Sequence, residues 1–193
     1  MKIKAAFIAV SAAALLAACN APANNNDTPA APASAAAAGP VELKAPAGVY
    51  ALDPTHAILQ TSVLHNSISN YTVRFNKIDS KVTLDPANLE NSTVEFTVDP
   101  TSVDANFPGD YAGTHANSGF RNWNEDIANN PAHLNARQFG QVTFKSTKVT
   151  KTGDRTADVT GDLTFLGVTK PVTFKATFNG EIESHPFLQV PAI

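Results

Sequence analysis

Residues 159–178 read VTGDLTFLGVTKPVTFKATF, and this stretch decides the fold class. Apolar or small residues occupy every second position from Val159 to Phe165 and again from Val172 to Phe178, with polar residues between them. Because successive side chains of a β-strand point to opposite faces, this period of two predicts two half-buried strands. The Leu166-Gly167 pair between them predicts a tight turn, which the glycine permits.

The same alternation recurs along much of the chain after Gly48, rich in the threonine, valine and phenylalanine that strands prefer. The predicted strands, about eight in number, cover residues 48–53, 56–65, 71–75, 82–84, 93–98, 142–144, 159–165 and 172–178. An antiparallel set with one apolar face buries that face by closing on itself or by pairing with a second sheet. The sequence therefore predicts an all-β, antiparallel, eight-stranded barrel, either filled by side chains or roomy enough for one small ligand.

Residues 99–140 form a long insertion that lacks this alternation. Trp123 and Ile127 recur at helical spacing ahead of Pro131, which predicts a short helix over residues 123–129. A further turn is predicted over residues 133–139. Because long segments of this kind are usually functional, we expect the insertion to cover one mouth of the barrel.

The N-terminus has the order of a secretory signal peptide: Lys2 and Lys4, then an apolar segment over residues 5–18. That segment is shorter than the roughly 20 apolar residues that span a bilayer. It ends in Leu-Ala-Ala-Cys at residues 16–19, which resembles the bacterial lipobox. We therefore predict a signal peptide over residues 1–18 and lipid attachment at Cys19, with acyl chains such as palmitate. The alternative is an ordinary secretory signal with an incidental cysteine.

Residues 19–44 contain the lipidated cysteine and a stretch dominated by alanine, proline and asparagine, which predicts a disordered tether ahead of one domain over residues 45–193. Asn20 follows the cysteine where lipoproteins retained at the inner membrane commonly carry aspartate. The predicted location is therefore the periplasmic side of a bacterial cell envelope, anchored by lipid and leaning towards the outer membrane.

Charge and cysteine content exclude several functions. The full chain carries 14 basic and 17 acidic residues, so loss of Lys2 and Lys4 with the signal leaves 12 against 17 and a formal charge of -5. A mildly acidic domain lacks the electrostatic footprint of a nucleic-acid binder. The chain has one cysteine, so a lipidated Cys19 leaves no thiol for a disulfide or a nucleophile.

Neither a metal site nor an enzyme is predicted. The histidines that could bind metal are His56, His65, His115, His133 and His185. His56 and His65 are nine residues apart on one predicted strand, which places them on opposite faces, and no HExxH motif is present. The sequence also lacks a Gly-x-Ser-x-Gly elbow. Asp53 is interpreted as a turn residue before Pro54, and Asp79 as a solvated side chain.

Phenylalanines on the apolar phase of the predicted strands leave two interpretations open. The first is ordinary core packing. The second is the wall of a ligand cavity. Periodicity alone does not choose between them.

Several segments, taken together, are similar in order and spacing to the YceI family. They are Tyr50–His56 (YALDPTH), His65 with Ser69 and Arg74-Phe75, Val98–Val103 (VDPTSV), His133-Leu134 with Phe139, Val142–Thr147 (VTFKST) and Gly161–Val172 (GDLTFLGVTKPV). The resemblance implies a periplasmic, lipocalin-like barrel that holds a polyisoprenoid chain, such as that of a quinone or polyprenyl lipid, with no cofactor and no catalytic group. It implies that the inward apolar side chains form the cavity wall: Val73, Phe75, Phe96, Phe144, Leu163, Phe165, Phe174, Ala176 and Phe178.

The resemblance also bears on the C-terminus, because family members continue beyond the counterpart of His185-Pro186 into at least one more strand. We therefore expect a barrel that is incomplete at its C-terminus, with an exposed edge through which a dimer could form. The expected function is a non-catalytic, membrane-tethered carrier or store of an isoprenoid lipid or polyprenyl quinone. The alternative is a cavity-free structural or interaction domain of the cell envelope.

Overall fold

The computed structural model describes residues 42–193. The predicted signal peptide, the lipid attachment at Cys19 and nearly all of the predicted tether lie outside the described residues. Within residues 42–193, no helix is long and apolar enough to cross a membrane. The strands of this region are β1 (Gly48–Ala51), β2 (Leu59–His65), β3 (Ser69–Phe75), β4 (Ile78–Leu84), β5 (Thr93–Val98), β6 (Val103–Asp104), β7 (Val142–Lys151), β8 (Thr156–Phe165) and β9 (Val168–Thr177).

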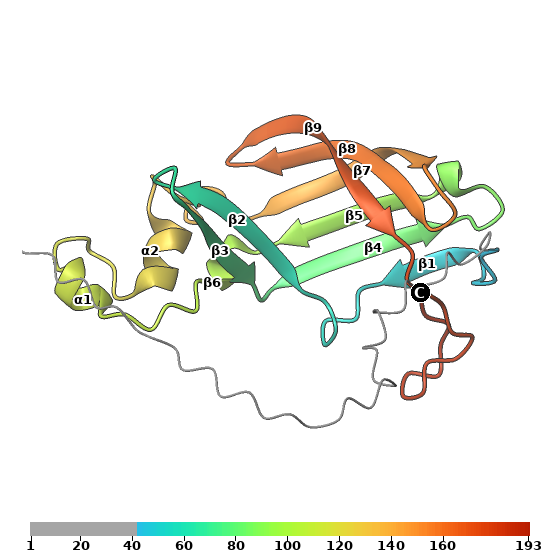
Figure 1. Cartoon of the computed structure of the whole chain (residues 1–193), viewed down its shortest axis with the longest axis horizontal. Coiled ribbons are helices and arrows are strands. Elements are labelled where there is room, and N and C mark those ends of the chain that lie inside the picture. Colours follow the sequence, from blue (N-terminus) through green and yellow to red (C-terminus); the bar gives the residue numbers. More distant parts are fainter. Residues whose placement is uncertain (1–41) are drawn as a thin grey trace, which may run out of the picture. The chain divides into compact units, whose positions relative to one another are not determined.

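These strands form two antiparallel sheets (Figure 1). The larger sheet has six strands in the order β1-β4-β5-β7-β8-β9, and the smaller has three in the order β2-β3-β6. The predicted all-β, antiparallel fold is confirmed. The strand count differs from the predicted eight, because β6 has only two residues and so carries no alternation to read. In the described part of the chain, β2 and β9 each pair along one side only.

The alternating stretch over residues 159–178 forms most of the β8–β9 hairpin. Phe165 pairs with Val168, and the two residues between them have positive φ values, 49° at Leu166 and 72° at Gly167. A two-residue turn with both φ values positive matches the twist of an antiparallel pair, so the predicted turn is confirmed. Pro171 lies within β9, where an edge strand tolerates the missing N–H.

The insertion contains two short helices, α1 (Tyr111–Thr114) and α2 (Trp123–Asn129). The helix predicted over residues 123–129 is confirmed. The side chain of Asn122 accepts a hydrogen bond from the N–H of Glu125 and so caps the first turn. Two 3₁₀ turns, η1 (Leu89–Asn91) and η2 (Pro100–Ser102), flank β5.

The structure corrects several strand boundaries. β1 ends at Ala51, β4 begins at Ile78, and β7 extends to Lys151. His56 lies outside β2, in a turn that the Asp53 carboxylate stabilises by accepting a hydrogen bond from the N–H of Thr55 at 2.8 Å. An Asx turn of this kind competes with strand pairing, so β2 begins at Leu59. The prediction that His56 and His65 share a strand is therefore wrong.

The segment after β9 returns to the start of β1, as Figure 1 shows for the dark red C-terminal part. The Glu181 carboxylate accepts hydrogen bonds from the backbone N–H groups of Lys44 and Ala45, each at 2.8 Å. Ile182 and Ala192 form an isolated antiparallel bridge within this segment. These contacts hold both ends of the described chain at the same end of the large sheet.

Candidate functional site

A cavity of about 740 Å³ lies between the β2–β3 hairpin and the insertion. The hairpin contributes alternate residues, because one face of each strand points into the cavity. Thr61 and Val63 from β2 lie opposite Val73 and Tyr71 from β3, and all four line the cavity. Phe75 continues the same face of β3. The period of two therefore builds one wall.

The insertion builds the facing wall. Trp123 and Ile127 line the cavity from α2, four residues apart and so on one side of the helix. Phe107 lines it from the loop before α1, and Leu134 lines it from the turn after α2. Figure 1 shows α2 beside the β2–β3 hairpin. The insertion thus packs over the smaller sheet. The sequence predicts that it covers one mouth of a barrel.

Aromatic rings hold the two insertion helices together. The His115 ring stacks on Tyr111 with a centroid separation of 4.7 Å and meets Trp123 edge-on at 4.4 Å. Phe107 meets Trp123 at 5.4 Å, also edge-on. Edge-to-face and stacked aromatic pairs stabilise such clusters beyond simple burial. The cluster fixes the orientation of His115 at the cavity.

Tyr111 of this cluster also forms a buried polar pair with Asp126. Tyr111 is 4% exposed and donates its hydroxyl hydrogen to Asp126 Oδ2 at 2.8 Å, while Asn130 Nδ2 donates to Asp126 Oδ1 at 2.7 Å. Burial and the neighbouring Asp126 carboxylate raise the pKa of Tyr111 above its ordinary value. Both carboxylate oxygens thus have neutral donors.

The cavity lining contains five ionisable side chains. Asp126 and the imidazoles of His65, His115 and His133 are its titratable side chains besides Tyr71, and among the described residues no lysine or arginine lines it. Residues 42–193 contain no cluster of three or more histidine, cysteine, aspartate or glutamate side chains placed to hold a metal ion. The arrangement offers a partly open, mostly apolar pocket with several polar groups in its wall.

The predicted wall residues divide into groups. Val73, Phe75 and Phe165 line the cavity. Phe96, Phe144 and Phe174 form an aromatic cluster on the large sheet, with Phe96–Phe144 and Phe144–Phe174 centroids each 5.0 Å apart, and Leu163 packs against the same core. Ala176 is exposed on the edge strand β9, and Phe178 lies 5.8 Å from the Arg155 guanidinium.

Sequence reasoning missed most of the insertion's contribution to the cavity. The sequence pattern marks Trp123 and Ile127 only as the apolar face of a short helix, and it includes His115 and His133 only among histidines with no predicted metal site. The length of the insertion carries part of this information, because it predicts that residues 99–140 cover one mouth of the barrel. No sequence period relates the insertion to β2 and β3, so the sequence does not predict which of their side chains face one another across the cavity.

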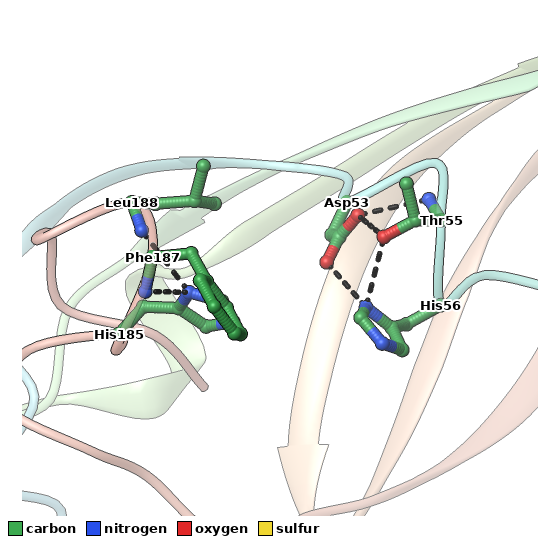
Figure 2. A network of polar contacts seen from close by, with 6 residues as sticks. All are labelled: Asp53, Thr55, His56, His185, Phe187 and Leu188. Carbon is green, nitrogen blue, oxygen red and sulfur yellow. Dashed lines mark hydrogen bonds and ion pairs between the residues drawn. The ribbon is translucent and has the colours of Figure 1, made fainter.

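Figure 2 shows a second polar network, outside the cavity, in the turn before β2. Asp53 Oδ1 accepts from the Thr55 hydroxyl at 2.6 Å, and Asp53 Oδ2 lies 2.6 Å from His56 Nδ1. These contacts hold the pKa of Asp53 well below its ordinary range. The hydrogen bond from the Thr55 hydroxyl lowers this pKa most, followed by the contact with His56. The structure thus places Asp53 in the turn, as its position before Pro54 predicts.

The other residues in Figure 2 belong to the C-terminal segment. His185 Nδ1 lies 3.3 Å from the backbone nitrogens of both Phe187 and Leu188 and accepts their hydrogen bonds. An imidazole nitrogen that accepts two N–H groups carries no proton itself. His185 therefore fixes a local turn.

An antiparallel β domain with an apolar cavity beneath a helical insertion has the architecture of proteins that enclose a small apolar ligand. A model of the YceI-like domain matches residues 50–190, and the chain belongs to this family. The resemblance inferred from the sequence is confirmed.

Relatives in several bacteria share this domain. A UPF0312 protein of Ectopseudomonas mendocina is 39% identical over 140 residues, covering 72% of this chain and 66% of that protein. The match to a UPF0312 protein of Pseudomonas fluorescens is 39% over 126 residues, covering 65% and 58%. The chain thus spans about three fifths to two thirds of the length of these curated relatives.

Solved structures also resemble the chain. Burkholderia cenocepacia BcnA is 26% identical, with 66% of this chain and 72% of that chain covered and a TM-score of 0.48. The Campylobacter jejuni YCEI protein is 23% identical, with 69% and 70% covered and a TM-score of 0.47. Membership of this family agrees with the antiparallel, all-β fold of the described residues.

Proposed function

We propose that the protein binds an isoprenoid lipid or polyprenyl quinone in its apolar cavity, as a non-catalytic carrier or store tethered to a membrane. The observation that carries this proposal is the cavity of about 740 Å³ between the β2–β3 hairpin and the insertion. Its volume lies within the range of about 300–1,000 Å³ that ligand pockets occupy.

The chemistry of the wall suits such a chain. An isoprenoid is a repeated branched hydrocarbon, so its affinity comes from apolar area removed from water, at about 25 cal/mol per Å². Val73, Phe75 and Ile127 offer aliphatic and aromatic surface on both sides of the cavity. No catalytic group is needed for this task.

We further propose that the wall continues along the large sheet. Phe165 lines the cavity, and Leu163 lies two residues earlier in β8, on the same face of the strand. Leu163 pairs with Phe144, whose ring contacts Phe174. The far end of a long chain would pass from Phe165 over this cluster and on to the region of Ala176 and Phe178.

The membrane attachment is part of the proposal. Acyl chains on Cys19 and the residues up to Lys44 would keep the domain near the bilayer in which isoprenoids dissolve, on the periplasmic side of the envelope and at the outer membrane. In the described part of the chain, β2 and β9 each leave one side unpaired, and these edges could associate between two copies.

The chain's sole tryptophan provides a direct test, because Trp123 lines the cavity. A polyprenyl quinone that enters should quench Trp123 fluorescence to saturation with one ligand per chain. The head group without its prenyl tail serves as the control, since collisions alone quench in proportion to concentration. Equal, unsaturated quenching by both compounds would instead favour the cavity-free envelope domain.

A further inference from the structure

The charges around the cavity are unbalanced. Asp126 is 7% exposed and lines the cavity, and in the described part of the chain no lysine or arginine lies within ion-pair distance of its carboxylate. Its partners, Tyr111 and Asn130, are neutral hydrogen-bond donors. A buried carboxylate without a cation repels another anion strongly, because the surrounding dielectric constant is low.

Its hydrogen bonds also limit what Asp126 can attract. Tyr111 occupies Oδ2 and Asn130 occupies Oδ1. A cationic ligand would have to displace one of these buried donors, or remain at a distance, and displacing a donor leaves a buried group unsatisfied. Asp126 therefore acts as a barrier to anions more than as a partner for cations.

His115 offers a hydrogen-bonding atom for an uncharged group. The Thr114 hydroxyl lies 2.8 Å from the carbonyl oxygen of Asp110 and 2.8 Å from His115 Nδ1. The Thr114 hydroxyl has one hydrogen and two carbonyl acceptors, Asp110 O and, at 3.3 Å, Tyr111 O. We therefore assign the proton of the neutral imidazole to Nδ1, which then donates to the Thr114 oxygen. The other ring nitrogen, Nε2, is then an acceptor on an imidazole that also lines the cavity.

We infer that the cavity selects an isoprenoid with an uncharged, hydroxyl-bearing head group and discriminates against the phosphorylated form of the same chain. Asp126 opposes the anion, and His115 Nε2 accepts a hydrogen bond from the hydroxyl. This inference rests on the proposed function and narrows its ligand class.

The test compares farnesol with farnesyl phosphate, two ligands that have the same prenyl chain, by isothermal titration calorimetry of the full protein. The measurement is made at pH 8, where free imidazole is uncharged. We expect farnesol to bind at least about tenfold more tightly, as expected for one uncompensated charge near another at reduced dielectric. Farnesyl phosphate that binds as tightly as farnesol, or more tightly, would overturn the inference while leaving the carrier proposal standing. Binding of neither ligand would count against the carrier proposal itself.

Variants separate the two residues. Asp126→Asn keeps the shape of the side chain but removes its charge. It should reduce the ratio of farnesol affinity to farnesyl phosphate affinity by about tenfold. The control Asp79→Asn removes the same charge at an exposed position of β4 and should leave the ratio as it is. An equal effect of both variants would assign the discrimination to net charge and overturn the role of Asp126.

His115→Phe keeps an aromatic ring against Tyr111 and Trp123 but removes Nε2. It should weaken farnesol binding about fivefold relative to the hydrocarbon farnesene, which has no hydroxyl. The wild-type ratio of farnesol to farnesene affinity provides the reference. An equal loss for both ligands would show that His115 contributes only shape.

Discussion

The ring of Phe144 in β7 meets the ring of Phe174 in β9 edge-on, with centroids 5.0 Å apart, although β8 lies between their strands. Gly161 in β8 makes room for this arrangement. A Cβ atom added there would lie 2.7 Å from Phe144 Cζ and 2.6 Å from Ser146 Cα, and it would also collide with the Lys145 carbonyl oxygen. The glycine is therefore required by a close approach.

Gly161→Ala should consequently destabilise the fold by about 2 kcal/mol, the usual cost of forcing extra atoms into a packed site. Gly180→Ala is the matched control, because no atom of residues 42–193 lies within 4 Å of a Cβ atom built at that position. Urea denaturation of both variants measures the difference. Equal free energies of unfolding would show that β7 and β8 can move apart at no cost.

Filling the cavity should block uptake without unfolding the domain. Thr61 is exposed and lines the cavity, whereas its neighbour Ser62 lies on the opposite face of β2. Thr61→Phe should weaken polyprenyl quinone binding at least about tenfold, and Ser62→Phe should leave it as in the wild type. The saturable quenching of Trp123 measures both. Similar binding by the two variants would place the ligand elsewhere.

The Asp53 turn predicts a pH dependence. Its pKa is lowered chiefly by the Thr55 hydroxyl, so the stabilisation is present above the ordinary aspartate pKa and is lost as the pH falls through the lowered value. Asp53→Asn should therefore lower the melting temperature at pH 7, with the difference shrinking in strong acid. Thr55→Val should raise the pKa of Asp53, measured by carboxyl carbon NMR. An Asp53 that titrates at the ordinary aspartate value in the wild type would contradict this account.

Glu181 should hold the beginning of β1 in place. Glu181→Ala removes both acceptors of the hydrogen bonds from the backbone N–H groups of Lys44 and Ala45, and bonds to charged groups contribute about 1.5–3 kcal/mol each. Glu181→Ala should therefore speed amide hydrogen exchange at both residues. Glu183→Ala, at an exposed position in the same segment, is the control. Unchanged exchange in Glu181→Ala would show that other contacts fix this segment.

Local periodicity predicted the elements whose causes are local. The β8–β9 hairpin follows from alternation and Gly167, and α2 follows from Trp123 and Ile127 ahead of Pro131. His56 lies outside the strand that the sequence predicts, because the Asp53 side chain competes with strand pairing for backbone hydrogen bonds.

The cavity was less predictable because it depends on contacts between distant segments. The sequence indicated Val73, Phe75 and Phe165, whose strand phase is readable. It gave no sign that His115 and Trp123 would face them, since the insertion has no period that relates it to β2 and β3. The partition of the phenylalanines between cavity and core depends likewise on how the sheets meet.

The most direct test of the central claim is mass spectrometry of an organic extract of the full-length protein, purified from the membranes of cells that make isoprenoid quinones. Parallel extracts of the Thr61→Phe and Ser62→Phe variants provide the comparison. The account predicts a prenyl lipid or quinone near one molecule per chain in the wild type and in Ser62→Phe, and little in Thr61→Phe. Extracts free of prenyl compounds, together with no uptake of added polyprenyl quinone, would contradict it.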